Sequence, residues 1–457
     1  MRHCLPLVRL PAAAAALCLW ACAPMDLPPR ASGTAPHDVY EAQIRELDAH
    51  LTALGRDWIT AANRALTAPI EVELPYREAR YLDPAGAAAV AYRIRLESGQ
   101  RVVARVNVAG ATHADVRLFL DLFFWPDANA PPRQVASAPA DRWELDYVAS
   151  RQGDYLLRVQ PELLRGGRAT VTVSAHASLG FPVAGRGMGQ VRSRFGASRD
   201  AGTRDHEGVD IFAPRGTPVL AAAPGRVTRV TTDRAGGKVI WLEETALGRR
   251  LYYAHLDSQA VRGGTMVNRG DTLGYVGNSG NARTTSPHLH FAVYWRGQGA
   301  ANPSFHLQEP PGRPAAFAGD TGLIGRRART LANTWLRALP NESAANVARI
   351  ETQTPVQVLA GAGRWYLARL PDGRQGYLGV GSAGRLDPLH VATVATASVV
   401  RTFPASFGFE LDSIARGQVV PVLGKFGRFL LVRHPNGHTG WIGSAALGSP
   451  RPTPSGG

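Results

Sequence analysis

The apolar positions of the chain change from a helical to a strand pattern near residue 70. Before that point, apolar residues recur three and four positions apart, at Ile44, Leu47, Leu51, Leu54 and Trp58. This spacing predicts one amphipathic helix over residues 37–68. After it, polar and apolar residues alternate in short runs such as Ile70-Glu71-Val72-Glu73-Leu74. Short alternating strands predict a β-sandwich over residues 69–178.

The remainder of the chain is also rich in strand patterns. Residues 180–305 are glycine-rich and form a second β domain in this interpretation. Residues 306–332 contain Pro310, Pro311 and Pro314, and we interpret them as a linker. A chain of 457 residues is too long for one core, so we expect about three or four domains in a mainly β, multidomain fold.

The C-terminal part contains an internal repeat with a constant offset of 64 positions. Pro371-Asp372-Gly373 corresponds to Pro435-Asn436-Gly437, and Gly376-Tyr377-Leu378-Gly379 corresponds to Gly440-Trp441-Ile442-Gly443. Each copy has a hairpin signal between alternating strands, which predicts two small antiparallel β-barrels. We place the first at residues 333–384 and the second at 390–446, followed by a flexible tail at 447–457. Both copies resemble bacterial Src-homology-3-like domains, which hold the cell wall in many bacterial hydrolases.

The first residues predict export. An apolar run follows Arg2 and Arg9, and residues 1–21 fit a signal peptide. The run ends in Leu19-Trp20-Ala21-Cys22, which resembles a bacterial lipobox and predicts lipidation of Cys22. The alternative is a plain secretory signal with an incidental cysteine. Residues 22–36 are interpreted as a tether, and no later segment is apolar enough for a transmembrane helix.

Cysteine usage and charge restrict the chemistry. All three cysteines, Cys4, Cys18 and Cys22, precede residue 23, so a disulfide framework and a thiolate metal site are excluded from the rest of the chain. A metal must then be held by His, Asp or Glu. The formal charge of +15 fits attraction to an anionic polymer, or equally a compositional bias towards arginine. The chain has no dense basic tract, and we expect no nucleic-acid partner.

Four histidines and one aspartate form the candidate active centre, namely His206, Asp210, His255, His288 and His290. Asp210 is a polar residue in an apolar strand, where a cation is the natural partner of a buried carboxylate. His288 and His290 are two apart in a strand, so their imidazoles face one side. Two imidazoles and one carboxylate are sufficient for a tetrahedral zinc site with its fourth position open.

These motifs resemble the lysostaphin or LytM-type zinc metallopeptidase family, with its duplicated hybrid motif. The family's His-x-x-x-Asp, isolated strand histidine and His-x-His motifs match His206 with Asp210, His255, and His288 with His290. The resemblance implies that His206, Asp210 and His290 bind one zinc ion per chain. It also implies that His255 and His288 are catalytic, polarising water and stabilising the tetrahedral intermediate.

Two departures from the family pattern concern the substrate groove. The loop from Asn281 to Ser286 is about two residues longer than usual, and Ala292 stands where a Glu commonly follows His-x-His-Phe. Arg283 in that loop is a candidate contact for a substrate carboxylate, with a solvated arginine as the alternative.

The resulting functional hypothesis is a zinc-dependent endopeptidase that hydrolyses peptide cross-links of peptidoglycan. We expect it in the periplasm, attached to the outer membrane by its N-terminal lipid. The alternative is a non-catalytic wall-binding protein or an activator of a separate amidase. The sequence leaves the oligomeric state open.

Overall fold

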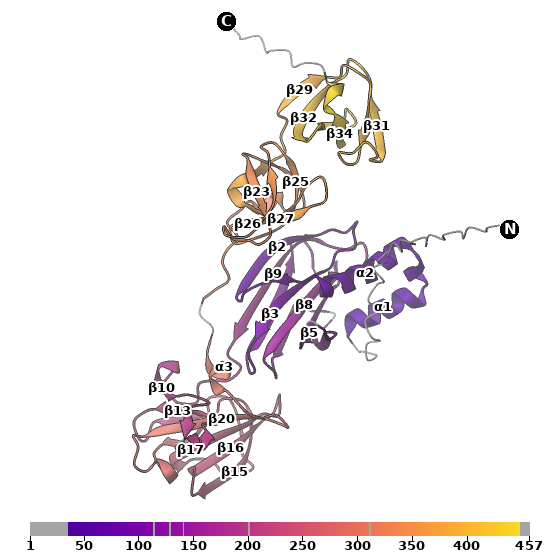
Figure 1. Cartoon of the computed structure of the whole chain (residues 1–457). Coiled ribbons are helices and arrows are strands. Elements are labelled where there is room, and N and C mark those ends of the chain that lie inside the picture. The colour runs from indigo at the N-terminus through magenta and orange to yellow at the C-terminus, as the bar shows by residue number, and fades with distance from the viewer. Residues whose placement is uncertain are drawn as a thin grey trace, which may run out of the picture.

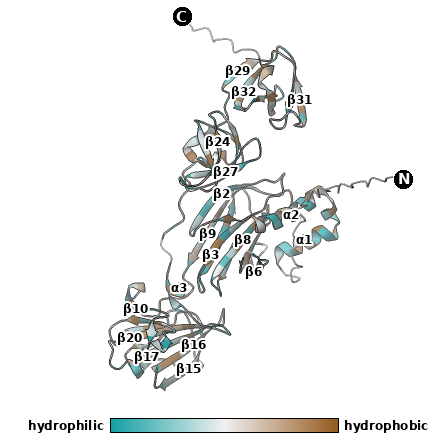
Figure 2. Ribbon diagram, viewed as in Figure 1, coloured by the Kyte–Doolittle hydropathy of each residue, from teal (hydrophilic) through white to brown (hydrophobic). Residues whose placement is uncertain are grey.

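The computed structural model describes residues 35–447, except for 113, 114, 128, 140, 200, 201, 310 and 311. The predicted signal peptide, Cys22 and the predicted tail from residue 448 lie outside the described residues. The fold is predominantly β, with several sheets and few helices, as predicted. Hydrophobic and hydrophilic residues are interspersed along the strands (Figure 2), in keeping with their alternating sequence pattern. In the described part of the chain, no helix is both long and apolar enough to cross a bilayer.

The single predicted helix over residues 37–68 is divided in two. Helix α1 (Pro36–Glu46) ends before a short 3-10 turn (Ala49–Leu51), and helix α2 (Ala53–Thr67) follows. Asp48 has the left-handed φ of 54°, and the Thr52 hydroxyl caps α2 by accepting the Gly55 N–H at 3.1 Å. The break removes Leu47 and Leu51 from the apolar stripe, leaving them 78% and 64% exposed.

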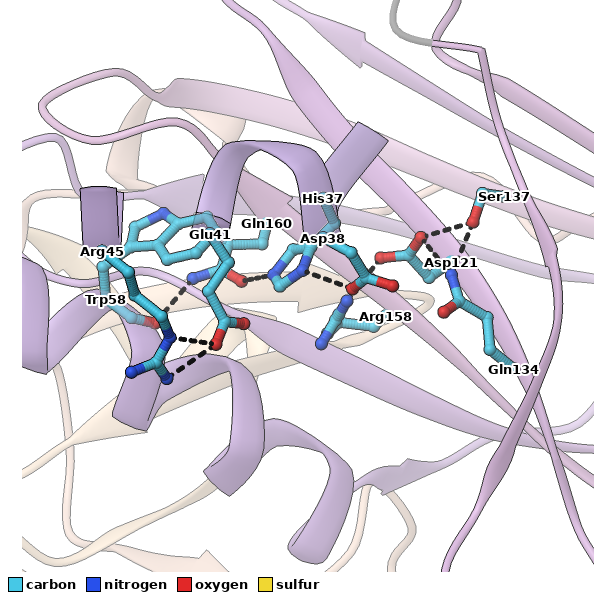
Figure 3. A network of polar contacts seen from close by, with 10 residues as sticks. All are labelled: His37, Asp38, Glu41, Arg45, Trp58, Asp121, Gln134, Ser137, Arg158 and Gln160. Carbon is cyan, nitrogen blue, oxygen red and sulfur yellow. Dashed lines mark hydrogen bonds and ion pairs between the residues drawn. The ribbon is translucent and has the colours of Figure 1, made fainter. Parts of the chain in front are cut away.

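Buried polar contacts attach the two helices to the sandwich (Figure 3). The indole of Trp58 donates to the Pro161 carbonyl at 2.8 Å, and the Gln160 amide donates to the Trp58 carbonyl at 2.9 Å. His37 contacts Gln160 at 2.9 Å. Since all three side chains are at most 1% exposed, these hydrogen bonds also satisfy groups that water cannot reach.

Two sheets form the sandwich and share one apolar core. The first has the order β1-β3-β8-β5-β6. Its strands are β1 (Ile70–Glu71), β3 (Val90–Leu96), β5 (Leu118–Trp125), β6 (Arg133–Ser137) and β8 (Gly153–Pro161). The second contains β2 (Tyr76–Leu82), β9 (Gly167–His176), β4 (Arg101–Val108) and β7 (Glu144–Val148), in that order. Tyr92 and Leu157 of the first sheet and Val171 of the second are fully buried between them.

The central domain, residues 180–305, is built on a 10-stranded sheet. Its main path runs β10-β13-β20-β17-β16-β15-β18, with β14, β19 and β21 joined at its sides. The strands of the domain are β10 (Val191–Ser193), β11 (Ser198–Arg199), β12 (Arg204–Asp205), β13 (Val209–Phe212), β14 (Pro218–Leu220), β15 (Gly225–Asp233), β16 (Gly237–Glu244), β17 (Arg250–Gln259), β18 (Met266–Val267), β19 (Thr272–Val276), β20 (His288–Trp295) and β21 (Gly299–Ala301).

A buried polar joint lies where the central domain meets the sandwich. Helix α3 (Pro303–Leu307) carries His306, whose Nδ1 lies 2.7 Å from Arg249 and 3.3 Å from Ser178. Arg249 also makes two hydrogen bonds to the Glu244 carboxylate, at 2.6 and 2.7 Å. The Ser178 hydroxyl donates to the Gly99 carbonyl of the sandwich at 2.6 Å. The predicted linker at 306–332 therefore begins inside a packed helix.

The two C-terminal repeats have matching strands. The first contains β22 (Arg327–Thr330), β23 (Thr334–Arg337), β24 (Asn346–Ile350), β25 (Pro355–Ala362), β26 (Trp365–Arg369), β27 (Gln375–Gly379) and β28 (Ala383–Arg385). The second contains β29 (His390–Thr393), β30 (Ser398–Arg401), β31 (Glu410–Ile414), β32 (Val419–Phe426), β33 (Phe429–Arg433) and β34 (Thr439–Gly443). Strands β23 to β27 correspond to β30 to β34 with the offset read from the sequence. Strand β22 takes residues 327–330 out of the predicted linker and pairs them with β25.

The sandwich and the first repeat share one continuous sheet. Ala79 and Arg80 of β2 pair with Gly361 and Ala360 of β25, which joins the two domains into an 11-stranded sheet. Figure 1 shows the first repeat against the β2 edge, with the central domain at the other end of the sandwich. The pairing satisfies backbone groups on a strand edge that would otherwise be open.

Candidate metal centre

Neighbouring strands of the central sheet bring the five predicted residues to one face. In the antiparallel register, Asp210 of β13 lies directly opposite His290 of β20, and His290 lies opposite Ala254 of β17. His255 follows Ala254 on β17. His206 precedes β13 and reaches the same place from its loop, with its side chain only 3% exposed. Leu289, between His288 and His290, is fully buried, as expected because successive side chains of a strand point to opposite faces.

Three donor atoms form a tight group. Oδ1 of Asp210 lies 3.1 Å from Nε2 of His206 and 3.0 Å from Nδ1 of His290, and the two nitrogens are 3.0 Å apart. Ligand atoms around a tetrahedral zinc ion at about 2.0–2.1 Å lie about 3.3 Å from one another. The chain's own residues therefore fit a zinc ion after an expansion of a few tenths of an ångström.

The electrostatics of the group favour a deprotonated ligand set. Burial acts to raise the pKa of Asp210, but hydrogen bonds and charge interactions with His206 and His290 hold it well below its usual range. Burial lowers the pKa of His290, against the opposing effect of Asp210. A metal ligand must be a carboxylate or a neutral imidazole, and these shifts keep both residues in the required form near neutral pH.

Outer contacts orient the three candidate ligands. The Arg194 carbonyl lies 2.9 Å from Nδ1 of His206, so an N–H at that position leaves the lone pair on Nε2, facing Asp210. Arg199 of β11 donates from Nη2 to the other carboxylate oxygen of Asp210 at 2.6 Å and to the Ser193 hydroxyl at 2.6 Å. Sequence reasoning missed Arg199, because nothing in its local pattern indicates that β11 folds over the centre.

Gly208 makes room for the imidazole of His290. A Cβ atom at position 208 would lie 2.6 Å from Cε1 of His290 and 2.7 Å from the Phe291 carbonyl oxygen. Real Cβ atoms do not approach that closely, so a side chain at position 208 is incompatible with the observed position of His290.

His255 and His288 lie beside the three candidate ligands and are oriented by backbone carbonyls. Nδ1 of His255 lies 2.9 Å from the Ser279 carbonyl, and Nδ1 of His288 lies 2.8 Å from the Ser286 carbonyl. Donation from Nδ1 leaves Nε2 of each ring with its lone pair. The two ring centroids are 5.1 Å apart.

His255 carries two further marks of a functional position. Its φ is +61°, a left-handed conformation that costs a non-glycine residue about 1–3 kcal/mol and clusters at active sites. Burial, with smaller contributions from His288 and His290, lowers the pKa of His255 to about 4. The ring is therefore neutral at physiological pH and able to accept a proton.

An aromatic row continues from the centre along the same sheet. The rings of Tyr252 and His290 are 5.9 Å apart, those of Tyr252 and Trp241 4.5 Å, and those of Trp241 and Tyr294 5.5 Å. Tyr294 is four residues after His290 on β20. Alternation along a strand therefore predicts that the two side chains share a face of the sheet. Tyr252 pairs with Ala292, the position where the family commonly has Glu.

Arg283, the predicted substrate contact, is exposed, and its backbone carbonyl accepts a hydrogen bond from the Asn278 amide at 3.2 Å.

A group of two histidines and one aspartate on an antiparallel sheet, with two additional histidines beside it, has the composition of a hydrolytic zinc centre. Residues 204–303 match the model of peptidase family M23 and contain all five of these residues. The match lies within the central domain.

Curated relatives are similar to a part of the chain. The chain is 36% identical over 107 residues to the DD-carboxypeptidase/endopeptidase Mpg of Neisseria meningitidis, covering 23% of this chain and 24% of the relative. It is 35% identical over 88 residues to the peptidoglycan DD-endopeptidase ShyC of Vibrio cholerae, covering 19% of each chain. The chain thus spans about a quarter or less of the length of these relatives.

A solved structure is similar to a quarter of the chain. The catalytic domain of lysostaphin from Staphylococcus simulans has 31% sequence identity, with 25% of this chain and 88% of that domain covered and a TM-score of 0.23.

Proposed function

We propose that this protein is a zinc metalloendopeptidase that hydrolyses peptide bonds in bacterial peptidoglycan. The observation that carries the proposal is the convergence of His206, Asp210 and His290, whose donor atoms lie 3.0–3.1 Å apart on one sheet face. The match of residues 204–303 to the model of peptidase family M23 supports a metallopeptidase. The named activities of the relatives support peptidoglycan as the substrate.

In this proposal His206 Nε2, Asp210 Oδ1 and His290 Nδ1 hold one zinc ion. Zinc bound there supplies a Lewis acid that polarises a carbonyl and lowers the pKa of a water. Arg199 keeps the Asp210 carboxylate in position by binding its outer oxygen. The Arg194 carbonyl holds His206 in the tautomer that presents Nε2.

His255 and His288 are assigned to proton transfer and charge stabilisation. His255 is unprotonated at neutral pH because burial lowers its pKa to about 4, so its Nε2 lone pair would be available to accept a hydrogen bond from the attacking water and polarise it. His288 would stabilise the oxygen on which negative charge develops. The row formed by Trp241, Tyr252 and Tyr294 provides an apolar surface along which a peptide stem of the substrate lies. Arg283 is retained as the candidate contact for a substrate carboxylate.

The location of the protein in the envelope belongs to the same proposal. Lipidation at Cys22 would attach the chain to the outer membrane and bring it to the peptidoglycan layer. The C-terminal repeats, by their resemblance to Src-homology-3-like modules, would bind the wall and raise the local concentration of substrate.

The experiment is digestion of purified sacculi by the chain, with mass spectrometry of the released muropeptides. The proposal expects release of cross-linked fragments as monomers by the wild-type protein and none by His290→Ala. The matched control is His390→Ala, which removes an exposed histidine of the second repeat and should leave release unchanged. Equal release by His290→Ala and wild type would refute the metallopeptidase function. Absence of release by all three proteins would favour the amidase-activator alternative.

A further inference from the structure

A second cluster of metal-ligating side chains lies in the second C-terminal repeat. His434 and His438 are at the two ends of the Pro435-Asn436-Gly437 turn between β33 and β34, and Asp412 extends from β31 towards them. Nδ1 of His434 lies 3.5 Å from Oδ2 of Asp412, and Nε2 of His438 lies 3.8 Å from the same oxygen. The three candidate donor atoms all lie within 4.8 Å of one another.

The hydrogen bonds of the two imidazoles indicate which ring nitrogens could meet a cation. Nε2 of His434 lies 3.2 Å from the Ser413 carbonyl, while Nδ1 accepts the Asn436 N–H at 3.1 Å. Nδ1 of His434 therefore carries the lone pair and Nε2 the proton, and an ion bound at Nδ1 would replace the Asn436 N–H as the partner of that lone pair. Nε2 of His438 is buried and has no hydrogen-bond partner among the described residues. The rings stack with centroids 4.7 Å apart and an interplanar angle of 10°.

The first repeat shows that the hairpin does not need these side chains. At the offset of 64 positions, His434, His438 and Asp412 correspond to Leu370, Arg374 and Ala348. Strands β26 and β27 nevertheless pair in the same way as β33 and β34, and the turn glycines Gly373 and Gly437 both have a φ of 90°. Since the fold is the same without them, the three residues of the second repeat need another explanation.

We propose that Asp412, His434 and His438 form a second cation site, which takes a divalent ion of the zinc class. Two imidazoles and a carboxylate are the ligand types that suit such ions. A tetrahedral zinc ion requires donor atoms about 3.3 Å apart, so the two imidazole nitrogens would move towards Asp412 Oδ2 from 3.5 and 3.8 Å, and the stacked rings would turn to face one ion. The site is independent of the proposed peptidase function and of the centre in the central domain.

The surroundings define what such an ion would do. It would add a link between β31 and the β33–β34 hairpin, which are already joined here by the Asn436–Asp412 hydrogen bond at 3.0 Å and the His434–Ser413 contact at 3.2 Å. The side chains of Asp412 and His438 are 31% and 37% exposed, so the fourth coordination position opens to solvent and to an external oxygen ligand. Without a metal, the same residues would only form polar contacts between the hairpin and β31.

The test measures zinc binding in the full chain after the first centre has been removed. In the Asp210→Ala/His290→Ala background, dialysis against zinc chloride should leave one zinc ion per chain, measured by elemental analysis and calorimetry. Adding His434→Leu and His438→Arg, the residues of the first repeat, should remove that ion and weaken zinc binding by more than about 100-fold, since losing a ligand exceeds the effect of losing its outer contacts.

Two controls make the outcome decisive. Lys425→Arg, an exposed change on β32 of the same repeat, should leave the retained zinc ion in place. Asp412→Ala, which introduces the residue of the first repeat, should weaken zinc binding without changing the turn. If circular dichroism shows that the double histidine replacement disturbs folding, the zinc affinity of Asp412→Ala decides the question. Zinc binding that is equal with and without these three side chains, or absent in the starting background, would overturn the proposal.

Discussion

Asp210 and His290 face each other across strands β13 and β20, and Oδ1 of Asp210 lies 3.0 Å from Nδ1 of His290. In a buried antiparallel pair, this register places an anion against a neutral ring with little water to separate them. A cation bound between the two side chains would accept a lone pair from each of them. Strand pairing therefore positions two of the three proposed ligands before any metal arrives.

Asp210→Asn tests the carboxylate at nearly constant volume. We expect zinc affinity to fall by at least about 10–100-fold, the effect of losing an outer contact, because the amide keeps the shape but loses the charge. Metal content by elemental analysis and muropeptide release should fall together. Asp141→Asn, an exposed site in the sandwich, is the control. Normal zinc content in Asp210→Asn would contradict the proposed ligand set.

His255→Ala and His288→Ala separate catalysis from metal binding. Each should lower kcat by about 10²–10⁴-fold, the usual contribution of a positioned acid or base. Zinc content should remain near that of the wild type, since neither ring belongs to the proposed ligand group. Kinetics on a defined cross-linked muropeptide gives kcat, and metal analysis of the same samples gives the zinc content. Loss of zinc in either variant would assign that histidine to the metal instead.

Arg199→Leu tests the outer contact to Asp210. The side chain is 33% exposed, so folding should be little affected. Zinc affinity should fall by about 10–100-fold, because the carboxylate loses the group that orients it. Arg199→Lys should recover part of this affinity, as it keeps a donor but offers a single point of contact. Equal affinity in wild type and Arg199→Leu would show that Arg199 has no positioning role.

Gly208→Ala tests the space beside His290. A methyl group 2.6 Å from the imidazole must displace the ring or the neighbouring strand, so we expect loss of zinc and a lower melting temperature. The matched change is Gly189→Ala, where an added Cβ has nothing within 4 Å. Thermal melting with and without zinc compares the two. A Gly208→Ala protein with normal zinc binding would mean that the observed close packing is not required.

Glu244→Gln tests the buried joint between the central domain and the sandwich. Arg249 is 0% exposed, and removing its partner's charge leaves a buried cation uncompensated. We expect a loss of about 3–5 kcal/mol in the free energy of unfolding. Glu144→Gln breaks an exposed ion pair with Arg105 and should cost less than about 1 kcal/mol. Urea denaturation measures both, and similar losses would contradict the importance of burial.

Much of this architecture follows from local pattern. Alternation in residues 70–176 indicated strands because side chains of a strand point to opposite faces in turn. The offset of 64 positions located matching strands in both C-terminal repeats, since each repeat encodes its own hairpins. Spacing on strand-like segments and the resemblance to a family pattern singled out His206, Asp210, His255, His288 and His290 as candidates.

Other features depend on which segments meet in space. Periodicity states which face of a strand is apolar but not which edge it pairs with, so the joining of β2 to β25 was invisible in the sequence. Leu47 and Leu51 fitted a helical stripe, yet the left-handed turn at Asp48 exposes them. Arg199 and Asp412 meet their partners on other strands or loops through tertiary packing. The order of residues determines local conformation and which side chains share a face of a strand or helix. Contacts between distant segments are decided only in the folded molecule, where strand edges pair and buried charges are neutralised.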